Sequence, residues 1–485
     1  MTEAGNNYSE KKTQLHISVR NLVEFIFREG DIDNRSSRAM SADAMMEGTR
    51  IHRKIQGSMG KEYQAEVPLS LVVEGDLYEL TVEGRADGIF TEDGKCFVDE
   101  IKGMYRKVEL FEKPVFVHRA QAMCYAYIFA LQNNMETIGI QMTYCNLETE
   151  QIKYFREEFS FEEIKKWFDD LMEEYGKWAT FQCEMKNQRQ ASIKELDFPY
   201  EYRPGQKKLV SDVYRTIMRQ KLLFMQAPTG VGKTISTIFP AVKAVGEELA
   251  DRIFYLTAKT ITATVAKETF ALLEKNGYRA KTIQITAKEK LCPCDEMECN
   301  PVTCPYAKGH FDRVNDAVFD LLHRCEMIER DDILSQADRY TVCPFELCLD
   351  TASWCDNIIC DYNYVFDPNV YLKRFFQEGI KGDYIFLIDE AHNMVERSRQ
   401  MYSAQIYKED FLTVKRIMKE HSRSIEKALE KCNKILLGMK RECENYTVYD
   451  TFGNMVFSFM RLMTLLDEFL PVSYTHLTLP TICSV

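Results

Sequence analysis

Two short apolar runs, each followed by a polar loop, stand out beyond residue 200. Residues 222–225 (LLFM) precede a glycine-containing loop, and the stretch ISTIFPAVKAV after that loop has apolar residues at helical spacing. Residues 384–388 (YIFLI) precede two acidic residues. Continuous apolar runs of this length, bounded by polar loops, are typical of strands that are buried on both faces of a parallel sheet. The pattern predicts an α/β fold in which a strand, a loop and a helix follow one another.

The first 190 residues have a different pattern. TVEGRADGIF and CFVDEIKG are predicted to be strands, with apolar and polar residues alternating in VDEIK, and HRAQAMCYAYIFAL is predicted to be a helix. A polar linker is expected near residue 190, where a helical stretch gives way to polar residues. Residues 396–471 are again predicted to be mostly helical, as in FLTVKRIMKEHSRSIEKALEKCNKILLGMK.

Composition narrows the class of protein. The 485 residues exceed the size of one hydrophobic core, so we expect about two to four domains. The 62 basic and 74 acidic residues give a net charge of −12, which argues against DNA binding by bulk charge but permits local basic grooves. The N-terminus lacks a signal-peptide pattern, and no apolar run approaches the roughly 20 residues that cross a bilayer. We therefore expect a cytoplasmic protein with no membrane partner, whose 16 cysteines are not a disulfide framework.

The segment KLLFMQAPTGVGKT, residues 221–234, has the strand–loop–helix context of a P-loop. Gly230 and Gly232 allow backbone N–H groups to turn toward phosphate oxygens. Lys233 is expected to reach the β- and γ-phosphates of ATP, and the Thr234 hydroxyl is expected to ligate Mg²⁺. Ala227 takes the place of the first glycine of the strict pattern.

A second motif, YIFLIDEAHN, places Asp389 and Glu390 at the carboxyl end of the second predicted strand. Open α/β sheets bind their ligands at this edge. We expect Asp389 to hold Mg²⁺ through water, and Glu390 to orient and deprotonate the water that attacks the γ-phosphate. The two motifs together predict an ATP-hydrolysing site.

The segment DEAH, residues 389–392, resembles the box of superfamily 2 helicases, and other segments are similar to the XPD/DinG-type branch of these enzymes. FPYEYRPGQKKLV resembles the adenine-side motif of that branch, FYLTAKTITATVAKE resembles its motif Ia, and CDYNYVFDP is also similar. The resemblance covers roughly residues 195–470. It implies an ATP-dependent DNA helicase that moves 5′ to 3′ on single-stranded and forked DNA, in repair or the processing of DNA ends.

The resemblance also implies which residues form the helicase site. Nucleotide contacts are expected from Arg203, Gln206, Ala227, Thr229, Gly230, Gly232, Lys233, Thr234 and His392. Contacts with the DNA backbone are expected from Thr257 and Lys259. The catalytic roles fall to Lys233, Asp389 and Glu390, and Mg²⁺ is expected at Thr234 and Asp389.

Cysteines cluster in KLCPCDEMECNPVTCP, residues 290–305, and a further cysteine follows in VCPFELC. In a reducing compartment such a cluster indicates metal binding. The helicase family carries an iron–sulfur domain in this interval, and its pattern selects Cys292, Cys299, Cys304 and Cys343 as ligands of a [4Fe–4S] cluster. Cys294 is a surplus thiol that could replace Cys292. A zinc site is the alternative, although zinc favours paired C-x₂-C hooks and this segment has none.

The cysteine-rich segment continues into YAKGHFDRVND, which adds three basic residues. Lys308, His310 and Arg313 are candidate phosphate contacts, with an ordinary solvated surface as the alternative.

A second constellation lies in the first 180 residues. It runs in the order His52, Asp87, Glu100 and Lys102 in an E-x-K strand, and then a Q-x-x-x-Y helix face formed by Gln121 and Tyr125. This order resembles the RecB-type nucleases of the PD-(D/E)xK superfamily.

The chemistry of that constellation suits phosphodiester cleavage. Asp87 and Glu100 can share a divalent cation, with His52 as a third ligand, and Lys102 can orient the water or stabilise the developing charge. Gln121 and Tyr125 would position the DNA strand. Because side chains alternate along a strand, Asp99 is expected to be a surface acid on the other side. The alternative is a nuclease fold that has lost its activity and only binds DNA.

The predicted domains follow these motifs along the chain. They are a nuclease-like domain (1–190), the first part of a RecA-like helicase domain (191–285), an iron–sulfur insertion (286–350), the second part of the RecA-like domain (351–395) and the start of a helical arch (396–471). Residues 472–485, VSYTHLTLPTICSV, resemble a translated sequencing adapter, which predicts a chain broken before its second RecA-like domain, with a natural divergent C-terminus as the alternative. The rival readings are a non-catalytic nucleic-acid-binding scaffold, and a nuclease with an ATP-driven switch and no unwinding.

Overall fold

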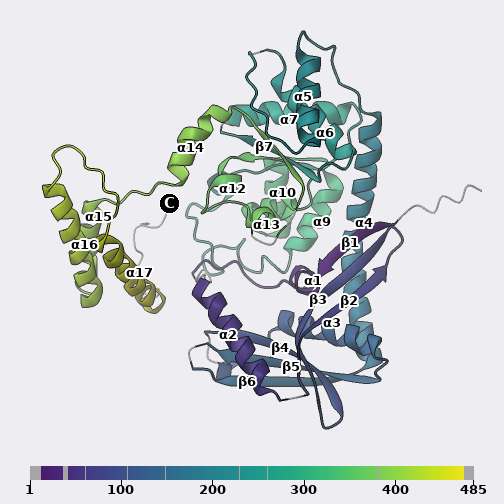
Figure 1. Cartoon of the computed structure of the whole chain (residues 1–485), viewed down its shortest axis with the longest axis vertical. Helices are drawn as coiled ribbons and strands as arrows, with labels where there is room; N and C mark the ends of the chain where they lie inside the picture. Colours follow the sequence, from purple (N-terminus) through teal and green to yellow (C-terminus); the bar gives the residue numbers. More distant parts are fainter. Residues whose placement is uncertain are drawn as a thin grey trace, which may run out of the picture. The chain divides into compact units, whose positions relative to one another are not determined.

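The computed structural model describes residues 12–35, 42–60, 62–105, 108–147, 149–228, 230–258, 260–377, 380 and 382–473 (Figure 1). Contacts divide these residues into two compact units. The first unit contains most of the described chain up to residue 392, and the second contains the described residues from 393 onward together with residues 35 and 366–369. Across the described residues, no helix combines the length and the apolar character that crossing a membrane requires.

The N-terminal part of the first unit is built on a mixed sheet with the strand order β1-β3-β4-β5-β6, in which β2 also pairs with β3. The strands are β1 (Thr13–Ser18), β2 (Gln64–Glu74), β3 (Tyr78–Glu92), β4 (Lys95–Met104), β5 (Thr137–Asn146) and β6 (Ile152–Ser160). β4 is antiparallel to β3 and parallel to β5, with Glu100 opposite Met142. The two strands predicted around Asp87 and Glu100 are therefore confirmed as neighbours.

Helices cover both faces of this sheet (Figure 1). They are α1 (Val19–Ile26), α2 (Ala42–Ser58), α3 (Phe116–Gln132) and α4 (Phe161–Glu195), with the 3₁₀ helix η1 (Val108–Leu110) before α3. Val98 of β4 belongs to the core that contains α3, whereas Ile101 packs against α2. Because alternate side chains of a strand point to opposite faces, α2 and α3 lie on opposite faces of the sheet.

Helix α4 runs through the segment that was expected to be a polar linker. It runs for 35 residues without a break, from a capping box at Ser160 and Glu163 to Glu195. Its last part packs against the next domain, since Ile193 belongs to that core and Arg189 pairs with Asp356. The polar linker predicted near residue 190 is therefore helical, because its apolar positions are buried against another domain.

The second part of the first unit is an all-parallel sheet in the order β11-β7-β10-β8-β9. Its strands are β7 (Arg252–Thr257), β8 (Thr282–Gln284), β9 (Met327–Ile328), β10 (Asn357–Asp361) and β11 (Tyr384–Ile388). The helices around it are α5 (Gln206–Met218), α6 (Lys233–Gly246), α7 (Thr260–Lys275), α12 (Asn363–Phe366), α13 (Lys373–Phe376) and the 3₁₀ helix η2 (Ala391–Asn393). The predicted α/β fold with a parallel sheet is confirmed.

One predicted strand is wrong. Residues 222–225 form no strand, and the side chains of Leu222 and Phe224 are each 89% exposed. The parallel sheet ends at β11, whose Phe386 and Ile388 remain 40% and 38% exposed. An apolar run becomes a buried strand only where it pairs with a neighbouring strand. Residues 222–225 pair with no strand of the described sheet, and side chains of α6 and α7 fill the core instead.

The cysteine-rich insertion lies between β8 and β10 in the chain. It contains α8 (Lys288–Leu291), α9 (Val314–Arg324), α10 (Arg330–Tyr340) and α11 (Pro344–Ala352), together with β9. α9, α10 and α11 pack on one another, and Val318, Leu321 and Leu347 are fully buried. Loops rather than regular elements hold four of its cysteines, Cys292, Cys294, Cys299 and Cys304.

The second unit is helical, as predicted for residues 396–471. It consists of α14 (Met394–Met401), α15 (Lys408–Met418), α16 (Arg423–Arg441) and α17 (Asn454–Ser473). Phe411, Met418, Ile425, Leu429 and Leu462 form its core. Most of the predicted irregular tail, from residue 474 onward, lies outside the described residues.

Candidate functional sites

The phosphate-binding loop ends where α6 begins. Gly230 and Gly232 both have left-handed backbones, with φ of 85° and 76°, and Lys233 is the first residue of the helix. The N-cap residue Gly232 provides no side-chain cap, so the first N–H groups of α6 are free of that partner. Free N–H groups and the helix dipole favour an anion at this position.

Two residues from the predicted adenine-side motif hold this loop. The side-chain amide of Gln206 donates to the Val231 carbonyl at 3.1 Å, and its oxygen accepts the Arg203 N–H at 3.0 Å. The Arg203 guanidinium donates to the Gly230 carbonyl. A Cβ on Gly232 would lie 2.7 Å from the Gln206 amide nitrogen, so a larger residue there would force the loop or the Gln206 side chain to shift, and the φ of 76° also favours glycine.

The acidic residues of the DEAH segment lie next to the loop. Lys233 Nζ is 3.7 Å from Glu390 Oε1, and His392 Nδ1 is 3.3 Å from Glu390 Oε2. Burial raises the pKa of Asp389, the neighbouring Glu390 raises it further, and Lys233 opposes both effects. The structure therefore brings Lys233, Asp389 and Glu390 together although more than 150 residues separate them in sequence.

The neighbouring predicted residues have mixed outcomes. Thr234 lies beside the Tyr255 hydroxyl, with which it shares a hydrogen bond, and Ala227 is half-buried at the start of the loop. Thr257 is 4% exposed, and its hydroxyl shares a hydrogen bond with Thr262, so its contact with a DNA backbone stays a prediction. Thr229 and Lys259 lie outside the described residues.

The four cysteines selected from the family pattern line one small cavity. Cys292, Cys299, Cys304 and Cys343 all contribute to its wall, together with Lys288 and the apolar side chains of residues such as Ile32 and Phe345. Cys294 does not line it, but its Sγ lies 3.9 Å from Cys304 Sγ. Burial raises the pKa of Cys343 to about 11, so this thiol is neutral without a metal. Four thiols around an apolar cavity suit a thiolate-ligated centre.

The basic residues that follow the cysteines have structural roles, which corrects the predicted phosphate contacts for two of them. His310 is fully buried, and its Nδ1 accepts the Cys343 N–H at 3.1 Å. Arg313 donates to the backbone carbonyls of Lys308, Tyr340 and Thr341. A loop-rich segment leaves many carbonyls unpaired, and long polar side chains satisfy them. The Lys308 side chain is exposed.

The second candidate site lies on β4 and α3. Lys102 Nζ is 2.6 Å from Glu100 Oε1 and donates to Gln121 Oε1 at 3.4 Å. The Tyr125 hydroxyl lies against Gly84, where an added Cβ would come within 2.6 Å of it. The predicted spacing of Gln121 and Tyr125 along one helix face therefore places both beside the E-x-K strand.

Asp87 approaches the same site from β3. Its Oδ2 accepts the Ile101 N–H at 2.7 Å, and its Oδ1 is 3.7 Å from His52 Nδ1 on α2. Burial raises the pKa of Asp87, while His52 and the hydrogen bond from Ile101 lower it. All six residues of the predicted nuclease constellation thus surround one end of β4.

Glu100 is a fully buried carboxyl group of this site. It is 1% exposed, and its Oε2 has no hydrogen-bond partner among the described residues. Burial raises its pKa to about 8, although Lys102 opposes the shift. A buried carboxylate oxygen without a partner is costly, and a divalent cation would relieve that cost.

Asp99 corrects another expectation. It does point away from Glu100, but it is fully buried and not a surface acid. It accepts hydrogen bonds from Tyr63 at 3.0 Å, Thr143 at 2.5 Å and Gln141 at 3.2 Å. The second face of the sheet is covered as well as the first, so alternation decides the direction of Asp99 but not its exposure.

Neither the cysteine site nor the site around Asp87 and Glu100 has a complete set of metal ligands in place among the described residues. Across the residues that the structure describes, no three His, Cys, Asp or Glu side chains gather into a group that could hold a metal ion as they stand. The ligand sets at the cysteines and at Asp87 and Glu100 therefore stay predictions.

Comparison with known proteins relates part of the chain to helicases. Residues 272–411 match the DEAD_2 family. The chain is 20% identical over 248 residues to regulator of telomere elongation helicase 1 of Rattus norvegicus, over 41% of this chain and 19% of that protein. It is 24% identical over 232 residues to general transcription and DNA repair factor IIH helicase subunit XPD/RAD3 of Saccharomyces cerevisiae, over 41% of this chain and 29% of that protein.

A solved structure described as truncated XPD is also similar, with 16% identity and a TM-score of 0.36 over 56% of this chain and 77% of that one. The sequence matches relate this part of the chain to XPD-like superfamily 2 helicases. The chain spans less than a third of the length of the two curated relatives.

Proposed function

We propose that this protein is an ATP-driven DNA helicase with an associated metal-dependent DNA nuclease, acting in DNA repair or end processing. The observation that carries the motor is the 3.7 Å approach of Lys233 to Glu390, which unites the phosphate-binding loop with the DEAH segment. The similarity of residues 272–411 to helicases supports the same reading. Movement 5′ to 3′ on single-stranded or forked DNA is part of the proposal and rests on the family resemblance.

In the proposed motor, each residue has a role that its position supports. The N–H groups at the start of α6 bind the phosphates of ATP, and Lys233 neutralises their charge. Arg203 and Gln206 keep the loop in its binding shape through their contacts with Gly230 and Val231. Thr234 and Asp389 would hold Mg²⁺, which neutralises the charge on the phosphates. Glu390 orients the water that attacks the γ-phosphate.

In the proposed nuclease, Asp87 and Glu100 would hold a divalent cation, with His52 beside them. A cation held there would lower the pKa of a bound water and polarise the phosphate. Lys102 stabilises the charge that develops on the phosphate oxygens, and Gln121 holds the Lys102 ammonium in place. The buried oxygen of Glu100, without a partner among the described residues, supports cation binding at this position.

Cys292, Cys299, Cys304 and Cys343 would hold a [4Fe–4S] cluster in the insertion. The cavity that they share supports a single centre bound by four thiolates. Anaerobically purified protein should be brown if the metal is iron and colourless if it is zinc.

The motor is tested by phosphate release from ATP with and without single-stranded DNA. We expect DNA to stimulate release and Lys233→Ala to abolish it, whereas Lys275→Ala, which changes an exposed lysine at the end of α7, should behave as wild type. Release that persists in Lys233→Ala would exclude this ATP site.

Strand displacement on a forked duplex separates the motor from its rivals. Unwinding that depends on ATP supports the helicase. Cleavage that depends on ATP without displacement indicates a nuclease with a nucleotide switch, and DNA binding with neither reaction indicates a scaffold.

A further inference from the structure

The chain that leaves α1 lies along the cysteine-rich insertion. We call residues 28–34 the N-terminal strap. Its backbone pairs with the insertion at two points next to the cysteines, where the Ile32 N–H donates to the Ala307 carbonyl at 2.9 Å and the Asn34 N–H donates to the Cys299 carbonyl at 2.9 Å. The Ile32 side chain forms part of the wall of the cysteine cavity. The strap therefore contacts both the backbone and the cavity of the candidate cluster site.

A reciprocal pair of carboxylates continues this contact. Asp31 Oδ1 accepts the Gly309 N–H at 2.6 Å, and Asp312 Oδ1 accepts the Gly30 N–H at 2.7 Å. The strap and the insertion thus each supply a carboxylate that accepts a hydrogen bond from a glycine of the other segment. Hydrogen bonds that involve a charged group are stronger than neutral ones, so this pair fixes the register of the strap on the insertion.

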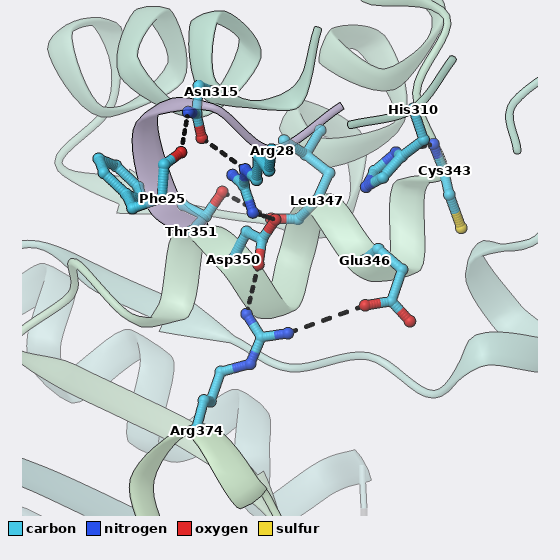
Figure 2. A network of polar contacts seen from close by, with 10 residues as sticks. All are labelled: Phe25, Arg28, His310, Asn315, Cys343, Glu346, Leu347, Asp350, Thr351 and Arg374. Atoms are coloured by element: carbon cyan, nitrogen blue, oxygen red, sulfur yellow. Dashed lines mark hydrogen bonds and ion pairs between the residues drawn. The ribbon is translucent and has the colours of Figure 1, made fainter. Parts of the chain in front are cut away.

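Arg28 joins the strap to α9 and α11 (Figure 2). Its Nε donates to Asn315 Oδ1 at 2.7 Å, and its guanidinium donates to Asp350 Oδ2 at 2.8 Å. The Arg374 guanidinium binds the other oxygen of Asp350 at 2.6 Å and lies 3.8 Å from Glu346. The Arg28 and Asp350 side chains are only 20% and 16% exposed, so water screens this pair weakly.

Helix α11 connects this network to the cysteine cavity. Cys343 is the N-cap residue of α11, and Asp350 lies two turns further along the same helix. Figure 2 shows Cys343, Glu346 and Asp350 along this helix, with Arg28 reaching its far end. A shift of α11 would therefore move a predicted cluster ligand and the partner of Arg28 together.

At its other end the strap is anchored in the nuclease-like part. Val19, Leu22 and Val23 of α1 are fully buried in the core of the N-terminal sheet. The Phe25 ring contacts Trp178 of α4 at 5.0 Å and Trp354 after α11 at 5.7 Å between ring centroids. The strap is thus held between the two parts of the chain.

We propose that the N-terminal strap is a structural part of the cluster site, so that the nuclease-like domain closes the cysteine cavity and the bound cluster in turn fastens that domain to the insertion. This inference rests on the cluster assignment of the proposed function and adds a role for residues 28–34. Because binding linkage is reciprocal, whatever loosens the strap must weaken retention of the cluster, and loss of the cluster must loosen the strap.

The first test measures how fast the cluster is lost, as bleaching of the visible absorbance of the full chain under air or an iron chelator. Arg28→Ala removes two hydrogen bonds, one of them to a charged partner, so we expect loss about tenfold faster than in wild type. Arg20→Ala is the matched control, because it removes an arginine of α1 whose ion pair with Glu24 is exposed. Bleaching of Arg28→Ala at the wild-type rate would overturn the inference while leaving the cluster assignment intact.

The second test uses the wild-type protein and needs no variant. Hydrogen exchange of the Ile32 and Asn34 amides is measured in wild-type protein before and after chelation. We expect exchange of both amides to accelerate about tenfold or more on cluster loss, while the amides of β4 stay protected. Unchanged exchange at both amides would overturn the inference, and a wild-type protein that is colourless when purified without air would overturn the cluster assignment and the inference with it.

Discussion

The ammonium of Lys102 lies 2.6 Å from one carboxylate oxygen of Glu100, while the other oxygen is buried without a hydrogen-bond partner in the described part of the chain. The pair is therefore half satisfied. A cation that binds the second oxygen would complete it, so the arrangement supports a site that is prepared for a metal rather than a settled salt bridge.

Replacing Lys102 should slow DNA cleavage. Lys102→Met keeps most of the side-chain volume and removes the charge, so we expect cleavage of single-stranded DNA with Mg²⁺ to fall by about a hundredfold, the size typical of losing one transition-state donor. The control is Lys95→Met at the start of the same strand, where the ion pair with Glu158 is exposed. Cleavage by Lys102→Met at the wild-type rate would contradict the proposed role.

Glu100 should make metal-free protein less stable as the pH rises. Its pKa is about 8 in the folded chain and near 4.5 when unfolded, so between these values the folded state holds a proton that the unfolded state has released. The free energy of unfolding therefore contains a contribution that decreases as the pH rises from about 4.5 to about 8. Denaturant unfolding of wild type and Glu100→Gln across this range measures it.

The difference in unfolding free energy between wild type and Glu100→Gln should change with pH in the direction set by the raised pKa of Glu100. We expect wild type to lose stability relative to Glu100→Gln toward pH 8, and Mg²⁺ to restore part of the loss in wild type alone. Parallel pH profiles for the two proteins would show that Glu100 ionises normally.

The fit of Gly232 against Gln206 predicts a specific defect in nucleotide binding. Gly232→Ala places a Cβ 2.7 Å from the Gln206 amide at a φ of +76°, so either the loop or the Gln206 side chain that binds the Val231 carbonyl must shift. We expect the affinity for ATP to fall by about tenfold, equivalent to ~1.4 kcal/mol. Gly277→Ala is the control, because its φ is +104° but its Cβ would meet nothing within 4 Å. Equal ATP affinities in the two variants would contradict the fit.

Cysteine substitutions should identify the first cluster ligand. Cys292, unlike Cys294, lines the shared cavity. We expect Cys294→Ser to retain iron and sulfide near the wild-type content, and Cys292→Ser and Cys299→Ser to lose most of both. Iron analysis of anaerobically purified variants measures this. Loss of iron in Cys294→Ser with retention in Cys292→Ser would reverse the assignment.

The spacing of residues along single helices and strands predicted which side chains share a face, but not which neighbouring residues are buried. The period of two along β4 is enough to place Glu100 and Lys102 on one side, and the i, i+4 spacing places Gln121 and Tyr125 on one helix face. The same rules did not reveal that Asp99 is buried, because Tyr63 and Thr143 cover it from other parts of the chain. Burial depends on which distant segments pack nearby, and a single strand carries no information about them.

Tertiary context also explains the other differences. Residues 222–225 have the composition of a buried strand, yet Leu222 and Phe224 are exposed because the run has no neighbour in the sheet. His310 has the chemistry of a phosphate contact but caps the backbone of Cys343. The strap was missed altogether, because its partners are about 270 to 320 residues away and no local pattern marks Arg28.

Helix α4 carries a mechanical consequence. At 1.5 Å per residue its 35 residues are about 52 Å long. Its first part packs in the core of the N-terminal sheet, and its last part packs in the core of the parallel sheet. Each residue of an α-helix turns the chain by about 100°. One residue inserted near the middle of α4 would therefore rotate its C-terminal end by about 100° relative to its N-terminal end and move Arg189 away from Asp356. Inserting seven residues would nearly restore the angle but lengthen the helix by about 10 Å. The rotation of the N-terminal mixed sheet relative to the parallel sheet therefore depends on the number of residues in α4.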